Sequence, residues 1–418
     1  MTWQTGCRCL VRLPLAARVG LGDKWRFSMQ ALDGVRRYSR LDCSFLLLLC
    51  LPPYANGLVG FANNSHTSGL AGSVVRTLAG GGAAGGSFGD SLGTGTSARF
   101  HRPAGVVVSS DGGQLFVADY SNHKIKIVNT ATRAVTNLCG SRVAGSAYGS
   151  AASAQFNSPF PLALRSDATT LYVGDYIGNV IRTVVVATGA VATLAGSGSA
   201  GSVDGAAALA SFAGPAGFAL LNDATLYVSD HQGHKLRKVA ISTGAVTTVA
   251  GVGGAGARDG AALTATFNQP MGLALSLSGA TLYVADSSSH KVRSVAVGST
   301  GAVSTVAGSG AALSVDGIGG AASFNAPLGL SLSHGASILY VSETSGYRVR
   351  AIELSTAAVT TVAGSGSAGA ADGTSGTAQF DQPQHIAITP LDDVTERLSL
   401  KPQGSNPRPK PQSQTPDQ

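Results

Sequence analysis

Acidic side chains recur along this chain at a nearly constant interval, and they are the first candidates for chemistry. They close five similar runs of Leu, Tyr and Val, as Asp119, Asp175, Asp230, Asp286 and Glu343. A carboxylate there could act as a general base, ligate a metal ion, or accept N–H bonds beside a cation. Each of these acids has a base 7 residues later, as Asp286 has Arg293. An active site needs its catalytic group once, so a pair repeated in copy after copy indicates a structural ion pair.

A second set of acids stands in the glycine-rich segments between these copies. Each is followed directly by glycine, as Asp204, Asp259, Asp316 and Asp372. Oxygen ligands in such loops could hold calcium. Side-chain bonding to the backbone of a tight turn explains the Asp-Gly pattern as well, and this interpretation is favoured. No metal site and no cofactor are therefore assigned.

The elements that position these acids form one repeating unit, of which Phe267 to Gly308 is a clear copy. Three runs rich in Leu, Val and Tyr and a fourth, AVSTVAG, are separated by Ser, Gly and Thr, which predicts four strands in a meander. Phenylalanines mark the copies at intervals of 56, 56, 55, 57 and 56 residues, as Phe100, Phe156, Phe212, Phe267, Phe324 and Phe380. A period of this length is typical of a repeat architecture.

Stacking such units predicts the fold class. A four-stranded sheet cannot bury both faces alone, and radial stacking gives a β-propeller. We expect an all-β, six-bladed propeller of four-stranded antiparallel blades over residues 74–390. Five repeats are complete, and the two ends share an incomplete blade. Its fourth strand is Val74 to Gly80, and its first strand lies in FDQPQHIAITP at 380–390. The missing middle strands should follow near Ser399, but residues 391–418 read as a disordered or truncated tail.

The N-terminal residues lack the repeat and resemble an addressing signal. Arginines at 36, 37 and 40 precede the apolar run SFLLLLCL, two prolines and the small-residue stretch ANG. Residues 1–57 are therefore predicted to be a targeting or signal-like segment, and residues 58–73 a linker. The apolar run is too short to span a bilayer. We expect secretion, with a mature end between residues 55 and 62; an organellar transit peptide, or a start at Met29, is the alternative.

Short motifs in the third strands identify a family resemblance. NHKI at 122–125, GHKL at 233–236 and SHKV at 289–292 each follow FVAD, YVSD or YVAD. Together with FxxPxGxA, they resemble the NHL repeat over about residues 74–390. Two copies depart from the pattern, with GNVI at 178–181 and GYRV at 346–349. The resemblance implies a six-bladed binding platform, and it also allows for lactonases and lyases.

Charge and motif content narrow the function classes. The formal net charge is +7, but residues 61–390 carry 17 Lys/Arg against 15 Asp/Glu, which is too balanced for a nucleic-acid footprint. An RNA-binding propeller remains an alternative because basic residues alternate along third strands. The other alternative is a lactonase-like hydrolase or lyase with a metal at the channel mouth. Of the residues expected there, only His385 could ligate, whereas a catalytic zinc normally has three protein ligands. Catalytic residues are therefore predicted to be none.

We expect a non-catalytic interaction module, monomeric, that binds a protein or glycan partner through its loop face. In a four-stranded blade, the turn between strands two and three and the crossover to the next blade emerge on one face. The crossovers are long, about 16 residues, and loops of this length are often functional. Aromatic or amphipathic residues, which are favoured as interface anchors, stand at otherwise interchangeable positions of this face. The candidate binding residues are Tyr120, Tyr148, Tyr176, His231 and Tyr347.

Overall fold

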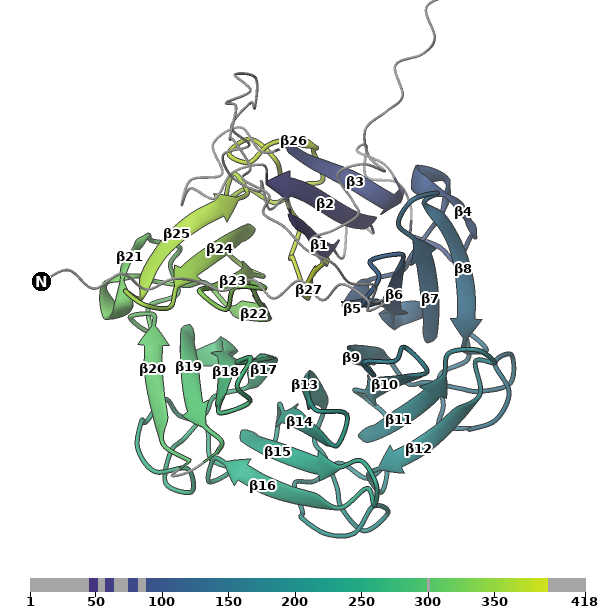
Figure 1. The fold of residues 1–418 in the computed structure, drawn as a ribbon, viewed down its shortest axis with the longest axis horizontal. Helices are drawn as coiled ribbons and strands as arrows, with labels where there is room; N and C mark the ends of the chain where they lie inside the picture. Colours follow the sequence, from purple (N-terminus) through teal and green to yellow (C-terminus); the bar gives the residue numbers. More distant parts are fainter. Residues whose placement is uncertain (1–44, 52–56, 64–73, 82–87, 299–300, 390–418) are drawn as a thin grey trace, which may run out of the picture. The chain divides into compact units, whose positions relative to one another are not determined.

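Each complete repeat folds into one antiparallel blade, and the blades stand around a central axis (Figure 1). The computed structural model describes residues 45–51, 57–63, 74–81, 88–298 and 301–389. All of them fall in one compact unit, residues 42–418. The predicted all-β propeller is confirmed, and five blades correspond to the five complete repeats. In the described residues, the only helical segments are the short 3-10 turns η1 (Gly95–Ser97), η2 (Tyr120–Asn122), η3 (Ser287–Ser289) and η4 (Gly319–Ala321).

The strands of each blade run outward from the axis in chain order (Figure 1). The first repeat forms β5 (Pro103–Val108), β6 (Gln114–Asp119), β7 (Lys124–Asn129) and β8 (Ala134–Cys139), with β4 (Gly93–Thr94) at its edge. The second forms β9 (Pro159–Leu164), β10 (Thr170–Asp175), β11 (Val180–Val185) and β12 (Val191–Ala195). The third forms β13 (Pro215–Leu221), β14 (Thr225–Asp230), β15 (Lys235–Ala240) and β16 (Val246–Ala250).

The last two complete repeats follow the same order. The fourth forms β17 (Pro270–Leu275), β18 (Thr281–Asp286), β19 (Lys291–Ala296) and β20 (Val303–Ala307). The fifth forms β22 (Pro327–Leu332), β23 (Ile338–Glu343), β24 (Arg348–Glu353) and β25 (Ala358–Ala363), with β21 (Gly317–Ile318) at its edge. Second strands are buried almost throughout, because neighbouring blades cover both of their faces. This explains their continuous apolar sequence.

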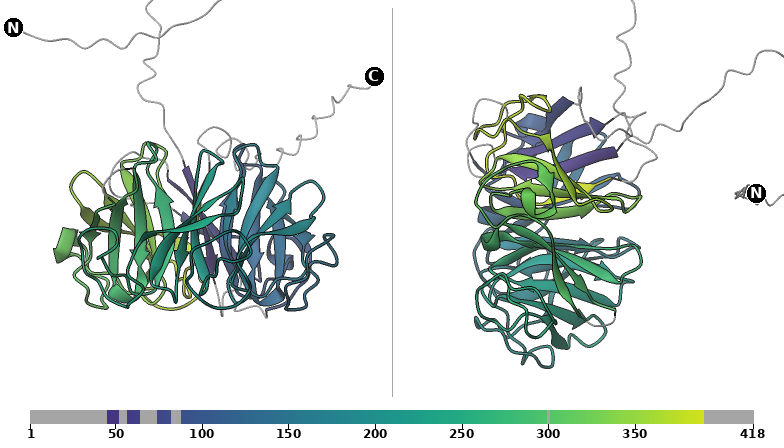
Figure 2. Two further views of the ribbon diagram at one scale, coloured as in Figure 1. Left: turned by 90° about the horizontal axis from the view of Figure 1, so that it is seen from below. Right: turned by 90° about the vertical axis from the view of Figure 1, so that its left-hand side faces the viewer.

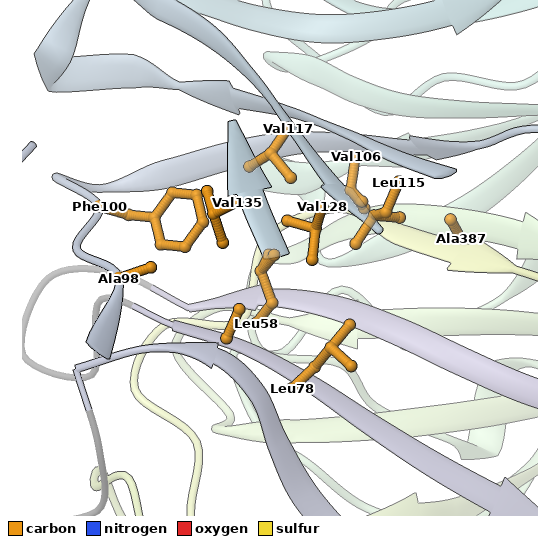
Figure 3. Close-up of a cluster of buried hydrophobic side chains, with 11 residues drawn as sticks. Leu58, Leu78, Ala98, Phe100, Val106, Leu115, Val117, Val128, Val135 and Ala387 are labelled. Carbon is orange, nitrogen blue, oxygen red and sulfur yellow. The ribbon is translucent and has the colours of Figure 1, made fainter. Parts of the chain in front are cut away.

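An additional sheet combines the two ends of the described chain, and we call it the end sheet. Its order is β26 (Gly373–Thr374), β3 (Val74–Gly80), β2 (Gly57–Asn63), β1 (Phe45–Leu51) and β27 (Ile386–Ile388). The predicted pairing of the two terminal fragments in one sheet is confirmed. Among the described residues, the strands between these two fragments are β2 and β1, which come from the N-terminal side. Apolar side chains then join this sheet to the first repeat, where Leu58 and Leu78 lie beside Val106 and Val128 (Figure 3).

Two of these strands lie in residues that the sequence predicts to be a targeting segment, 1–57, and a linker, 58–73. β1 contains the apolar run of the targeting segment, and β2 lies mostly in the linker. Seven consecutive apolar residues suit a strand as well as a signal sequence. Residues 1–44 and the predicted tail, 391–418, lie outside the described residues.

Glycines in the first strands let neighbouring blades approach closely around the axis. A Cβ on Gly105 would collide with the carbonyl oxygen of Phe160, and one on Gly272 with that of Leu328. Between the last and the first inner strands, the backbone N–H of His385 donates to the Ala104 carbonyl over 3.3 Å. The blades surround the axis as a disc (Figure 2).

Candidate functional site

The repeated acids form buried ion pairs, as their recurrence predicts. In the fourth repeat, the Asp286 carboxylate accepts a hydrogen bond from the Asn268 backbone over 2.7 Å and from Arg293 over 2.8 Å. The Arg293 guanidinium also lies 5.1 Å from the centre of the Phe267 ring. The third and fifth repeats repeat this arrangement. The phenylalanine, acid and base that mark each copy are therefore one packed unit, and their chemistry is structural.

The loop acids complete this unit from the crossover. Asp259 accepts from Arg293 over 2.6 Å and from the Thr305 backbone over 3.0 Å. Asp204 binds Arg237 and Thr248 in the same way. Burial alone would raise the pKa of Asp204, but these hydrogen bonds hold it below its ordinary value. Among the described residues, no three His, Cys, Asp or Glu side chains gather as they would around a metal ion.

The second repeat departs from this pattern because its loop acid is replaced by Tyr148. Arg182 donates instead to the Ser146 and Ala147 carbonyls, over 3.0 and 3.1 Å. Its guanidinium lies 3.8 Å from Asp175, compared with 2.9 Å for Arg237 and Asp230. One Asp175 oxygen, Oδ2, is buried and accepts no hydrogen bond from the described residues. Burial therefore raises the pKa of Asp175 to about 7, only partly opposed by the Asn157 backbone and Arg182.

This pKa gives a testable pH dependence. The folded state holds a proton on Asp175 at a pH where the unfolded chain, with a carboxyl pKa near about 3.9, has lost it. The contribution of Asp175 to stability is thus present at low pH and falls as pH rises from about 4 to 7. We expect Asp175→Asn to gain stability relative to the wild type between pH 5 and pH 8 in urea unfolding.

The exposed Asp167 supplies a control of opposite sign. Backbone and side-chain hydrogen bonds from Thr169 lower its pKa. Asp167→Asn should therefore lose stability relative to the wild type as pH rises through the carboxylate range. A parallel pH trend in both variants would contradict the role given to Asp175.

The histidines of the repeat motif connect neighbouring blades by hydrogen bonds, and we call them the stapling histidines. In the first, third and fourth repeats, the ring nitrogen Nδ1 accepts a backbone N–H of the next blade over 3.1 Å; the acceptors are His123, His234 and His290. Asn179 accepts the corresponding bond from Gly214 in the second repeat. Burial lowers the pKa of His123 and His290, which suits a neutral acceptor. These positions are structural.

Three of the five predicted binding residues come together on one face. We call it the crossover face, because it is formed by the crossovers and by the turns between second and third strands. Tyr176 donates to or accepts from Nδ1 of His231 over 3.0 Å, and its ring centre lies 6.4 Å from that of Tyr120. Each of the three directly follows the acid that ends a second strand. The fourth and fifth repeats have Ser287 and Thr344 at this position. One side of the channel mouth is therefore aromatic.

The other two predicted residues lie apart from this cluster. Tyr148 is 76% exposed in its crossover. Tyr347 occupies the position of the stapling histidines, with a left-handed φ of 54° like that of His123. No described aromatic contact connects either residue to the cluster.

Tyr120 and Tyr176 of this cluster line a cavity of about 190 Å³ at the channel mouth. Its walls are Tyr120, Phe160 and Tyr176 with Arg102, Ala104, Met271, Leu328 and Gln384. Several of these residues, such as Phe160 and Met271, directly follow the proline that begins a first strand. The sequence prediction for the channel mouth singled out only His385 and did not include these residues. The proline that begins each first strand was the signal that could have placed them.

His385 lies deeper in the channel, where it lines a second cavity of about 300 Å³. Its ring meets the edge of Phe160 with 5.0 Å between centres. Its Nε2 atom is buried and has no hydrogen-bond partner among the described residues. Burial lowers the pKa of His385 to about 4, so the ring is neutral.

Comparison with known proteins matches the repeat and the fold. The family model described as NHL repeat matches residues 100–128. The chain is 26% identical over 301 residues to Protein SUPPRESSOR OF QUENCHING 1, chloroplastic, of Arabidopsis thaliana, covering 69% of this chain and 28% of that protein. It is 26% identical over 291 residues to human NHL repeat-containing protein 2, covering 62% and 39%. The chain thus spans less than half the length of these relatives.

A solved structure supports the fold alone. A structural genomics protein of unknown function from Bacteroides thetaiotaomicron superposes with a TM-score of 0.58 at 17% identity, covering 82% of this chain and 85% of that one. In the part of the chain that the structure describes, no helix is long and apolar enough to cross a membrane.

Proposed function

Because this chain is an NHL-repeat β-propeller, we propose that it is a non-catalytic, monomeric interaction module that binds a protein or glycan partner through the crossover face. The observation that carries the proposal is the aromatic cluster of Tyr120, Phe160, Tyr176 and His231 beside a cavity at the channel mouth. Large aromatic side chains beside a concavity are typical interface anchors. The repeated acids and bases of the third, fourth and fifth repeats form close ion pairs inside the blades, which favours a structural role for them.

The integrity of this face depends on closure of the ring. The further proposal is that the end sheet is the sixth blade. Its register supports this: β1 and β2 pair Leu49 with Val59 as β18 and β19 pair Val284 with Arg293. The bond between His385 and Ala104 is consistent with an inner ring continued by β27.

Secretion remains a prediction. The end sheet provides a test of it, because β1 lies before the predicted cleavage site. Cleavage between residues 55 and 62 would remove β1 from its place between β2 and β27. A secreted chain cut there and a ring closed by β1 exclude each other. Sequencing the N-terminus of the protein purified from its own cells decides between them.

Paired substitutions test the binding face. Tyr120→Ala with Tyr176→Ala should weaken the capture of partners by the immobilised propeller by about fivefold or more, equal to about 1 kcal/mol. The matched control is Asp111→Ala with Thr243→Ala, two exposed turn residues on the opposite face. Quantitative mass spectrometry measures captured proteins, and a glycan array measures bound glycans. Both double variants must first have the same melting temperature as the wild type. An equal loss of partner capture in both double variants would show that the partner does not bind through the crossover face.

A further inference from the structure

The cavity at the channel mouth has walls that favour one kind of occupant. Its volume of about 190 Å³ suits a single ring, since a cavity of about 150 Å³ can hold benzene. Tyr120, Phe160 and Tyr176 contact one another with ring centres 5.7–6.4 Å apart. Such spacings suit tilted and edge-to-face packing, and a further ring could extend the cluster. Met271 and Leu328 supply an apolar wall in the same cavity.

The polar groups in the lining argue against a sugar. Six of the eight lining residues are apolar or aromatic, and the polar groups are the side chains of Arg102 and Gln384 and the hydroxyls of the two tyrosines. The Tyr176 hydroxyl is already bonded to His231. A sugar ring carries hydroxyls around its rim, and buried hydroxyls without partners cost free energy. An aromatic side chain makes no such demand.

The charge at the rim adds a second preference. Arg102 is the one charged residue in the lining of this cavity, and its guanidinium carbon lies 5.6 Å from the centre of the Tyr120 ring. A guanidinium offers five N–H donors, so it can serve more than one acceptor. A cation beside an aromatic pocket complements a carboxylate next to the inserted ring.

We propose that the cavity receives one aromatic side chain of a protein partner, presented beside an acidic residue. This inference rests on the proposed function and narrows its partner class from protein or glycan to an acidic, aromatic protein segment. Insertion buries the ring against Tyr120, Phe160 and Tyr176. Arg102 then orients the flanking carboxylate.

Short peptides test the proposal with the full chain. Saturation-transfer NMR would be recorded with the capped tripeptides Asp-Phe-Asp, Asp-Leu-Asp and Lys-Phe-Lys, and with methyl glucoside. We expect saturation of the Phe ring protons in Asp-Phe-Asp and a dissociation constant in the millimolar range. Lys-Phe-Lys and Asp-Leu-Asp should bind several-fold more weakly. Equal binding of Asp-Leu-Asp, or stronger binding of the glucoside, would overturn the proposal.

Single substitutions connect this binding to the cavity. Tyr120→Leu keeps an apolar side chain and should weaken the binding of Asp-Phe-Asp by about two- to thirteenfold, the range measured for aromatic pairs. Leu277→Ala is the control, since it removes an exposed apolar side chain outside the cavity lining. Arg102→Gln should reduce the preference for Asp-Phe-Asp over Lys-Phe-Lys. Equal effects of Tyr120→Leu and Leu277→Ala would place the peptide elsewhere.

The two hypotheses fail in different ways. If the peptides do not bind, but Tyr120→Ala with Tyr176→Ala still releases a captured partner, only the pocket assignment is wrong. If the peptides bind and the paired variant keeps every partner, the proposed role of the crossover face is wrong.

Discussion

Replacement of Arg293 by alanine is expected to destabilise the propeller by about 3–5 kcal/mol, the usual cost of leaving a buried charge without its partner. Arg293 is fully buried and donates to Asp286, Asp259 and the Thr266 carbonyl. Its removal leaves the Asp286 carboxylate buried without its partner. Burial already raises the pKa of Asp286 to about 6. Urea unfolding at neutral pH, followed by two independent probes, measures the loss.

The end sheet suggests the matched variant. Leu51 and Val59 hold the register positions of Asp286 and Arg293 in β1 and β2. Apolar replacement of a whole buried pair is often tolerated, so Asp286→Leu with Arg293→Val should recover more than half of the loss. Arg258→Ala, which removes the exposed arginine beside Asp259, should cost less than about 1 kcal/mol. If the double variant had a lower free energy of unfolding than Arg293→Ala, this account would be contradicted.

Deletion of residues 1–56 is the second change with a large expected effect. It removes β1, the strand that pairs with both β2 and β27. Two sheet edges would then lie open, and β27 would lose its strand partner. We expect the melting temperature to fall by about 10 °C or more, since about 2–4 °C per kcal/mol applies to a large domain.

The control deletion ends at residue 43 and keeps every described strand. It should melt within a few degrees of the full chain. If the deletion to residue 56 melted at the same temperature as this control, β1 would not be part of the stable fold.

The repeat was predictable because its marker residues are the packed unit itself. Phe267, Asp286 and Arg293 recur together, since Arg293 contacts both of the others. β1 and β2 were not found because they lack this acid and base. An apolar strand that lacks these residues cannot be aligned with the other repeats, and its composition is that of a signal sequence.

The candidate site was predictable only where position within the repeat determined it. Tyr120, Tyr176 and His231 share one position after the acid, and the structure brings them together. Tyr347 aligns with the stapling histidines in the motif GYRV, so the sequence held a signal that it belongs elsewhere. The cavity was not predictable, because its walls combine residues from several blades whose spacing around the axis no single repeat encodes.

The junction of β27 and β1 has a consequence for the connectivity of the fold. In the fourth repeat, the inner strand ends at Leu275 and its neighbour begins at Thr281. The end sheet makes the same strand pairing between Ile388 and Leu47 without that turn. With the end sheet as the proposed sixth blade, this pairing takes the place of a hairpin whose two strands are not joined by a turn, and the described strands would form a cyclic arrangement that lacks one such link. Circular permutation should be tolerated: a short turn from β27 to β1, with new termini in any long crossover, would preserve every strand pairing.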